Sequence, residues 1–173
     1  MNYKKELTAA MDSLAQDPLV RFVGYGISIG KAMGTLKNVA PAQLIEMPVA
    51  ENLMVGFATG LALKGLKPVV FFERFDFILN ALDAIVNHLD KIKTISRGEF
   101  NPTMILRIVV GNRNKPLFTG ETHTQDFHVP FKQLITFPVV SLPNAEIIQQ
   151  EYALAHKSLS DHSTTIIEFK DMV

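Results

Sequence analysis

One acidic residue stands near the start of a segment that is otherwise nearly all apolar. Glu51 lies in the stretch MPVAENLMVGFATGLALKG, residues 47–65, which is rich in small side chains. The simplest explanation is that an acid in the first turn of a helix is favoured by the helix dipole. However, Gly56, Ala58 and Gly60 predict a thin helix that packs closely, so that its start is buried in an interface. A carboxyl group that loses its hydration there is a candidate for acid–base chemistry.

The histidines provide a second group of candidates. His123 and His128 lie on a long polar loop, GNRNKPLFTGETHTQ (residues 111–125), and at its exit, whereas the other three lie in or near helices and a turn. Loops carry binding and catalytic residues more often than the elements that they connect. Since no pair of these histidines has metal-ligand spacing with an acid, we predict no metal ligand in this chain.

A third group is the stretch FFERFDF, residues 71–77, in which four aromatic residues surround charged ones. We expect most of these rings to lie in the core. A ring at the turn that follows the strand could stack on a flat ligand.

The elements that must position these residues follow from the periodicity of the apolar positions. Strands are predicted over 21–29, 43–47, 67–73, 103–110, 137–142 and 164–169, and helices over 1–17, 47–64, 75–95 and 144–157, with Asp76 as the N-cap of the third helix. Continuous apolar strands that alternate with helices predict a three-layer α/β fold, with a mainly parallel sheet covered by helices on both faces. Ligands bind at the carboxyl ends of the strands in such folds. We therefore expect Glu51, the turn at 73–77 and the loop before Gln125 at one edge of a single domain, residues 1–173.

Composition narrows the possible functions. The chain has 173 residues, 47% of them hydrophobic, with 17 basic and 17 acidic residues and no cysteine. The absence of net charge argues against a nucleic-acid partner, and no apolar run is long enough to span a membrane. We expect a cytoplasmic protein without disulfides.

The glycines of GYGISIG, residues 24–30, follow a predicted strand and leave a nicotinamide-dinucleotide site as an alternative. Against it, no clear helix follows these glycines, and no acid ends the next strand in the usual place for a ribose contact.

Three stretches together resemble the pyrimidine-binding domain of thiamine-diphosphate enzymes. They are EMPVAENLMVGFATGLALKGLKPVV (residues 46–70), FFERFDFILNALDAIVN (residues 71–87) and GETHTQ (residues 120–125). The resemblance is greatest to the beta subunit of the 2-oxo-acid dehydrogenase decarboxylating component and more distant to the transketolase central domain, and it covers nearly the whole chain.

The resemblance implies roles for individual residues. Glu51 corresponds to the acid that hydrogen-bonds the cofactor aminopyrimidine and activates the cofactor, and Phe77, with Phe75 before it, to the aromatic contact with that ring. Arg74 stands about where transketolase-type members carry a further aromatic residue near the pyrimidine, and the resemblance therefore places it with the cofactor-binding residues. His123 corresponds to a histidine that faces the substrate.

Two departures concern the substrate and the partner. The loop before His123 is usually glycine-rich, whereas here Arg113 and Lys115 form a basic pair that would suit an anionic substrate. The chain has no Gly-Asp-Gly, the motif that holds the cofactor diphosphate and magnesium in this family. We therefore expect a half-enzyme that acts on a small 2-oxo acid or ketose in a homodimer or heterotetramer, with a partner subunit that binds the diphosphate and magnesium. A non-catalytic assembly module of the same fold is the other alternative.

Overall fold

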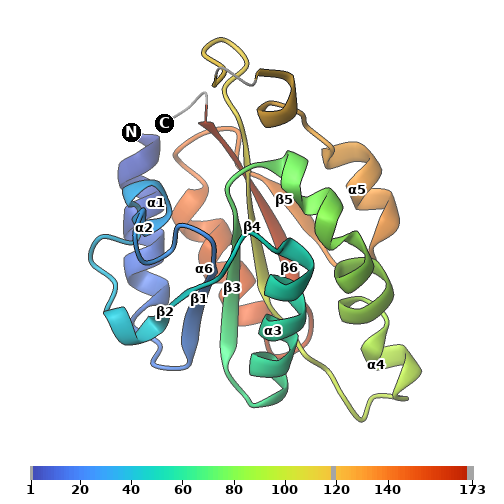
Figure 1. The fold of residues 1–173 in the computed structure, drawn as a ribbon. Helices are drawn as coiled ribbons and strands as arrows, with labels where there is room; N and C mark the ends of the chain where they lie inside the picture. Colours follow the sequence, from blue (N-terminus) through green and yellow to red (C-terminus); the bar gives the residue numbers. More distant parts are fainter. Residues whose placement is uncertain (1, 118–119, 171–173) are drawn as a thin grey trace.

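The computed structural model describes residues 2–117 and 120–170, and shows a six-stranded sheet between two layers of helices (Figure 1). The strands are β1 (Val20–Gly24), β2 (Leu44–Glu46), β3 (Lys67–Phe72), β4 (Ile105–Val110), β5 (Val139–Ser141) and β6 (Thr164–Phe169). Their order across the sheet is β2-β1-β3-β4-β6-β5, and every neighbouring pair is parallel. The predicted fold class is confirmed.

Helices cover both faces of this sheet (Figure 1). They are α1 (Tyr3–Leu14), α2 (Lys31–Gly34), η1 (Pro41–Gln43), α3 (Glu51–Leu63), η2 (Phe75–Ala81), η3 (Asp83–Leu89), α4 (Ile92–Ile95), η4 (Gly120–His123), α5 (His128–Leu134) and α6 (Ile148–Ser158). Alternate side chains of β4 enter different cores: Ile105 and Val109 join the core with α1 and α6, and Leu106 and Ile108 join the one with α3 and η2. Because β4 is buried on both faces, its sequence is an apolar run, interrupted by Arg107, rather than an alternation of apolar and polar residues.

The helix predicted over 75–95 is broken into three pieces, which corrects the sequence-based prediction. A 3₁₀ helix, η2, is followed by a π helix, η3, and by the short α4. At the start of η3, the backbone amide of Ala84 donates a hydrogen bond to Asn52 Oδ1, 3.2 Å away on α3. A side chain that enters the ladder of backbone hydrogen bonds in this way interrupts a helix. Asp76 is not the N-cap, since that position belongs to Arg74.

Other boundaries also differ from the predictions. The first strand ends at Gly24, where a Cβ atom would lie 2.7 Å from the Phe71 carbonyl oxygen, so that only glycine allows this close approach to β3. Helix α3 starts at Glu51 rather than Met47, and α5 was not predicted. The motif of α5, HVPFKQL, carries a proline and is too short for a helical period to stand out.

A buried ion pair joins β4 to β6 on the face covered by α1 and α6. The Arg107 guanidinium donates through Nε to Glu168 Oε1 at 2.7 Å and through its second arm to Oε2 at 3.0 Å, and both residues are fully buried. Tyr152 of α6 donates its hydroxyl to the same carboxylate at 2.6 Å. The guanidinium also lies 4.9 Å from the centre of the Phe71 ring. The pair therefore fixes the middle of the sheet against α6.

We expect Arg107→Met to destabilise the chain by about 3–5 kcal/mol, because it leaves the Glu168 carboxylate buried without its cation. Chemical denaturation would measure this loss. Lys93→Met is the matched control, since the Lys93–Asp161 pair is mostly exposed and should contribute less than about 1 kcal/mol. Equal stability of the two variants would show that the buried pair is not needed.

Candidate active site

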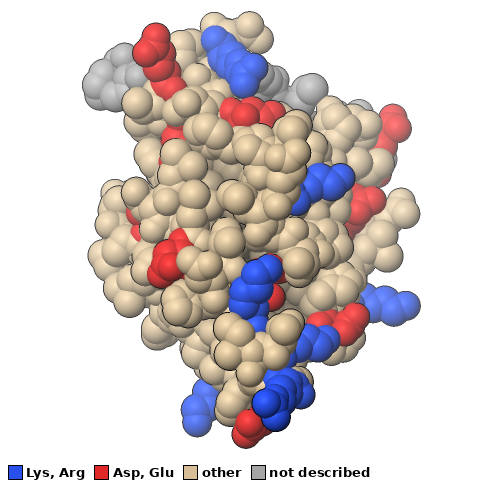
Figure 2. Space-filling view, turned by 90° about the vertical axis from the view of Figure 1, so that its right-hand side faces the viewer, with Lys and Arg blue, Asp and Glu red and all other residues tan. Residues whose placement is uncertain are grey.

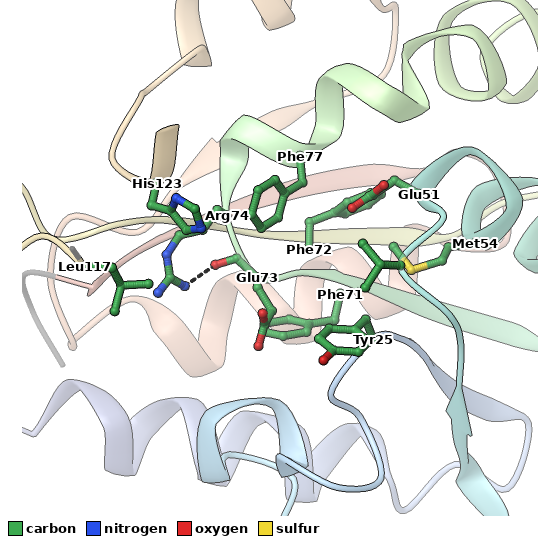
Figure 3. Close-up of a pocket in the computed structure, with 11 residues that line it drawn as sticks. Tyr25, Glu51, Met54, Phe71, Phe72, Glu73, Arg74, Phe77, Leu117 and His123 are labelled. Carbon is green, nitrogen blue, oxygen red and sulfur yellow. Dashed lines mark hydrogen bonds between the residues drawn. The ribbon is translucent and has the colours of Figure 1, made fainter. Parts of the chain in front are cut away.

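A cavity of about 240 Å³ opens at the carboxyl ends of the central strands (Figure 3). Its walls come from segments that follow β1, β2, β3 and β4, together with the first turns of α3 and η2. The lining residues are Tyr25, Val49, Glu51, Met54, Phe71, Phe72, Glu73, Arg74, Phe77, Leu117 and His123. Four of the residues predicted at this edge of the sheet, Glu51, Arg74, Phe77 and His123, thus lie together in one hollow.

Glu51 is the first residue of α3 and is only 7% exposed. Its carboxylate lies at one end of the cavity (Figure 3), and Oε2 accepts a hydrogen bond of 3.4 Å from Asn80 Nδ2. The helix N-terminus favours a negative charge at this position. The neighbouring wall is formed by apolar side chains such as Val49 and Met54. A carboxyl group in such surroundings can hold or release a proton next to a ligand that excludes water.

Phe77 and His123 meet in the middle of the cavity. Their rings are 5.2 Å apart and nearly perpendicular, so that the edge of one faces the other. His123 is half-buried, and its Nδ1 lies 3.0 Å from the Thr122 hydroxyl. Phe77 follows β3 by way of η2, whereas His123 ends η4, so that two distant segments form one wall.

A glycine brings the histidine to this position. A Cβ atom at Gly111, directly after β4, would lie 1.8 Å from the His123 carbonyl oxygen. The absence of a side chain therefore lets the loop lie directly on the end of the strand. Gln125 adds a second tie, since its amide donates to Asp76 Oδ1 at 2.8 Å.

Three of the predicted site residues lie outside the cavity. Phe75 is fully buried in the core, where its ring contacts Phe127 and Phe131 edge-on. Arg113 and Lys115 are exposed and do not line the cavity, and Arg113 Nε donates to the Thr124 carbonyl at 3.2 Å. The predicted loop 111–125 includes residues 118–119, which lie outside the described residues.

An acid lies against the glycine loop after β1, at the end of the next strand, β2, which corrects the expectation that no acid ends that strand. Glu46 accepts the backbone amide of Gly26 at 2.6 Å and that of Ser28 at 2.5 Å. Backbone amides at such loops are the groups that bind a pyrophosphate. Here a carboxylate already occupies these two amides and would repel a phosphate, which argues against the dinucleotide alternative.

Sequence reasoning missed Tyr25, Glu73 and Gly111 as parts of the site. Tyr25 and Glu73 both directly follow strands, and that position alone was a usable signal. The role of Gly111 had no such signal, because it depends on a residue twelve positions further along the chain. Among the described residues, no three His, Asp or Glu side chains lie together as in a metal site.

The family model for the pyrimidine-binding domain of transketolase matches residues 1–135, and the chain belongs to this family. Among curated proteins, it is 28% identical to the mitochondrial pyruvate dehydrogenase E1 component subunit beta of Saccharomyces cerevisiae, over 95% of this chain and 52% of that protein. It is 27% identical to the 2-oxoisovalerate dehydrogenase subunit beta of Pseudomonas aeruginosa, over 78% of this chain and 39% of that protein.

Solved structures show the same fold at lower sequence identity. A split-gene transketolase, described as an inactive beta4 tetramer, matches with a TM-score of 0.60 and 16% identity over 95% of this chain and 50% of that chain. A thiamin diphosphate-dependent enzyme from Mycobacterium smegmatis, itself described as putative, matches with a TM-score of 0.69 and 12% identity over 94% of this chain and 30% of that chain.

The chain spans about half the length of the yeast subunit and a smaller share of the bacterial one. None of the described helices is both long and apolar enough to cross a bilayer. Because the relatives include mitochondrial and bacterial proteins, the cytoplasmic location stays a prediction.

We expect Gly111→Ala to displace the His123 loop, because the added methyl group would overlap the His123 carbonyl oxygen. The chemical shifts of the His123 ring, measured by NMR, should change while the unfolding temperature falls by only a few degrees. Gly60→Ala is the control for stability, since this exposed glycine has no positive φ and nothing within 4 Å of its added Cβ. Unchanged His123 shifts in Gly111→Ala would show that the close contact is not required.

Proposed function

We propose that this chain is the pyrimidine-binding part of a thiamine-diphosphate-dependent enzyme that acts on a 2-oxo acid or a ketose. The observation that supports this most is the buried Glu51 carboxylate at the end of a cavity with aromatic walls. Membership of the transketolase pyrimidine-binding family and the similarity to 2-oxo-acid dehydrogenase beta subunits point to the same chemistry.

The residues present fit the aminopyrimidine ring of this cofactor. The ring is flat and aromatic with polar edges, and the cavity offers its faces the side chains of Val49, Met54 and Phe77. Its ring nitrogen needs one acidic hydrogen-bond partner, and Glu51 provides a carboxyl group at that end. When bound, thiamine diphosphate supplies the carbanion chemistry that cleaves the bond beside a substrate carbonyl.

Each site residue then has a separate task. Glu51 would hold the cofactor ring by a hydrogen bond between its carboxyl group and the ring nitrogen, and would hold the proton of that bond. Phe77 contacts the ring and keeps water away from the carboxyl group. His123 faces the substrate, where an imidazole can donate a hydrogen bond to an oxygen of the substrate. Phe75 has no part in this assignment, because it lies in the core.

A partner subunit would supply the diphosphate and magnesium site. The outward side of α3 supports this part of the proposal, because Leu53, Gly56, Phe57 and Gly60 are exposed and uncharged there. The side of the molecule that Figure 2 shows carries few charged side chains across its middle, while Lys and Arg side chains gather at its lower end. An apolar helix face of this kind is typical of an interface between subunits.

We expect Glu51→Gln to lower turnover of the complete enzyme by about two orders of magnitude or more, because the amide cannot exchange the proton. The measurement is the steady-state rate of the chain combined with its diphosphate-binding partner and magnesium. Glu99→Gln, at an exposed acid remote from the cavity, controls for the change of charge.

Near-normal turnover of folded Glu51→Gln protein would remove the assigned role. A wild-type complex that forms but neither binds thiamine diphosphate nor turns over would instead support the assembly-module alternative.

A change on α3 tests the partner surface. We expect Phe57→Asp to weaken association with the partner by at least tenfold, because it places a charge in an apolar interface, while the exposed position leaves the fold intact. Leu154→Asp is the matched control, since Leu154 is similarly exposed on α6, across the sheet. Calorimetry of the two variants with the partner measures both affinities, and equal affinities would place the interface elsewhere.

A further inference from the structure

Arg74 is an almost fully buried cation in the wall of the cavity. Its residue is 6% exposed, and its side-chain stem packs where Gly111 leaves room beside β4. Figure 3 shows the guanidinium at the end of the cavity away from Glu51, near Leu117 and His123. One arm donates to the backbone carbonyl oxygen of Glu73. Since that bond uses one of five N–H donors, most of the hydrogen-bonding capacity of the group points elsewhere.

The Arg74 guanidinium forms no ion pair with any other residue that the structure describes. Burial lowers the Arg74 pKa, and the charges of Glu73 and Asp76 act in the opposite sense from further away. An arginine stays charged in such a site, and a buried charge without a partner is costly. A fold that tolerates this cost has a cation available for a ligand.

A second cation lies within electrostatic reach. Lys170 directly follows the last strand, and its pKa is lowered by burial and by the positive charge of Arg74. Lys170 does not itself line the cavity, and the charge of Glu73 acts on both cations in the opposite sense. His123 lies beside Arg74, and Phe77 lies between them and the Glu51 end of the cavity (Figure 3).

We propose that Arg74 binds an anionic group of the substrate, a carboxylate or a phosphate, at the end of the cavity opposite Glu51. This inference rests on the proposed function, which places the reacting carbon near His123. The planar guanidinium matches a carboxylate or phosphate in a bidentate contact, whereas the exposed Arg113 and Lys115 do not reach the cavity. Arg74 therefore takes the role that the sequence assigned to the basic pair of the loop.

Two parts of a substrate could provide this anionic group: the carboxylate beside the reacting carbonyl, and an anionic group at the far end of the substrate. Three probes separate them. 2-Oxovalerate has only the first, 2-oxoglutarate has a distal carboxylate as well, and inorganic phosphate reports the anion site alone.

Calorimetric titration of the full chain with these probes tests the proposal without needing turnover. We expect Arg74→Met to weaken phosphate binding at least tenfold, and Arg74→Lys to restore part of the loss. An equal loss for both oxo acids identifies the carboxylate beside the carbonyl, and a larger loss for 2-oxoglutarate identifies the distal group. Arg97→Met is the control for removing one arginine, because Arg97 is exposed and lies outside the cavity.

Unchanged affinity of folded Arg74→Met protein for all three probes overturns the proposal. So does a loss of affinity for the probes in Arg113→Met protein that Arg74→Met protein does not show. A loss of affinity for thiamine diphosphate but not for thiamine, in the complex with the partner, also overturns it, since Arg74 would then serve the cofactor. If the wild-type complex does not bind thiamine diphosphate at all, the proposed function is wrong. The phosphate titration still shows whether Arg74 binds an anion, because it does not require the cofactor.

Discussion

A carboxyl group kept out of water at the head of α3 is the constraint on which the rest of the site depends. A charged or protonated acid is tolerated in such a position only where local dipoles and polar groups compensate for lost hydration. The first turn of α3 provides the dipole, and Asn80 provides one long hydrogen bond. The remaining surroundings are apolar, so that a ligand of the right shape completes the environment of Glu51. The shape of the cavity and the burial of Glu51 therefore depend on each other.

The parallel sheet explains how residues far apart in sequence reach this acid. The strands end at a common edge, and each following segment contributes one wall: Tyr25 after β1, Glu51 after β2, Arg74 and Phe77 after β3, and His123 after β4. The opposite face of the sheet has a different task. There the ion pair of Arg107 and Glu168 joins β4, β6 and α6, and Arg107 lies against Phe71, which also lines the cavity. The ion pair on the face covered by α1 and α6 therefore helps to hold the strands whose carboxyl ends form the cavity.

Much of the fold could be predicted from sequence because it follows from local patterns. The buried strands are long apolar runs, and the helical segments between them imply parallel pairing. The positions of Glu51, Phe77 and His123 at one edge followed from the same rule, with the resemblance to a known family, and the structure gathers them. What failed depended on contacts between distant residues. Asn52 interrupts the helix after β3, and Gly111 makes room for the His123 carbonyl. Neither the core position of Phe75 nor the burial of Arg74 can be read from residue type, because neighbouring side chains in one short turn point to opposite sides.

The carboxylate of Glu46 has a consequence for how the cavity meets a ligand. By accepting the amides of Gly26 and Ser28, it fixes the loop that carries Tyr25 before any ligand arrives. Ordering one backbone residue reduces conformational freedom by about 1–2 kcal/mol at room temperature. For the few residues of this loop, that loss occurs during folding instead of during ligand binding. The wall formed by Tyr25 is thus preorganised, and the contacts it makes can contribute to affinity without a further entropic penalty.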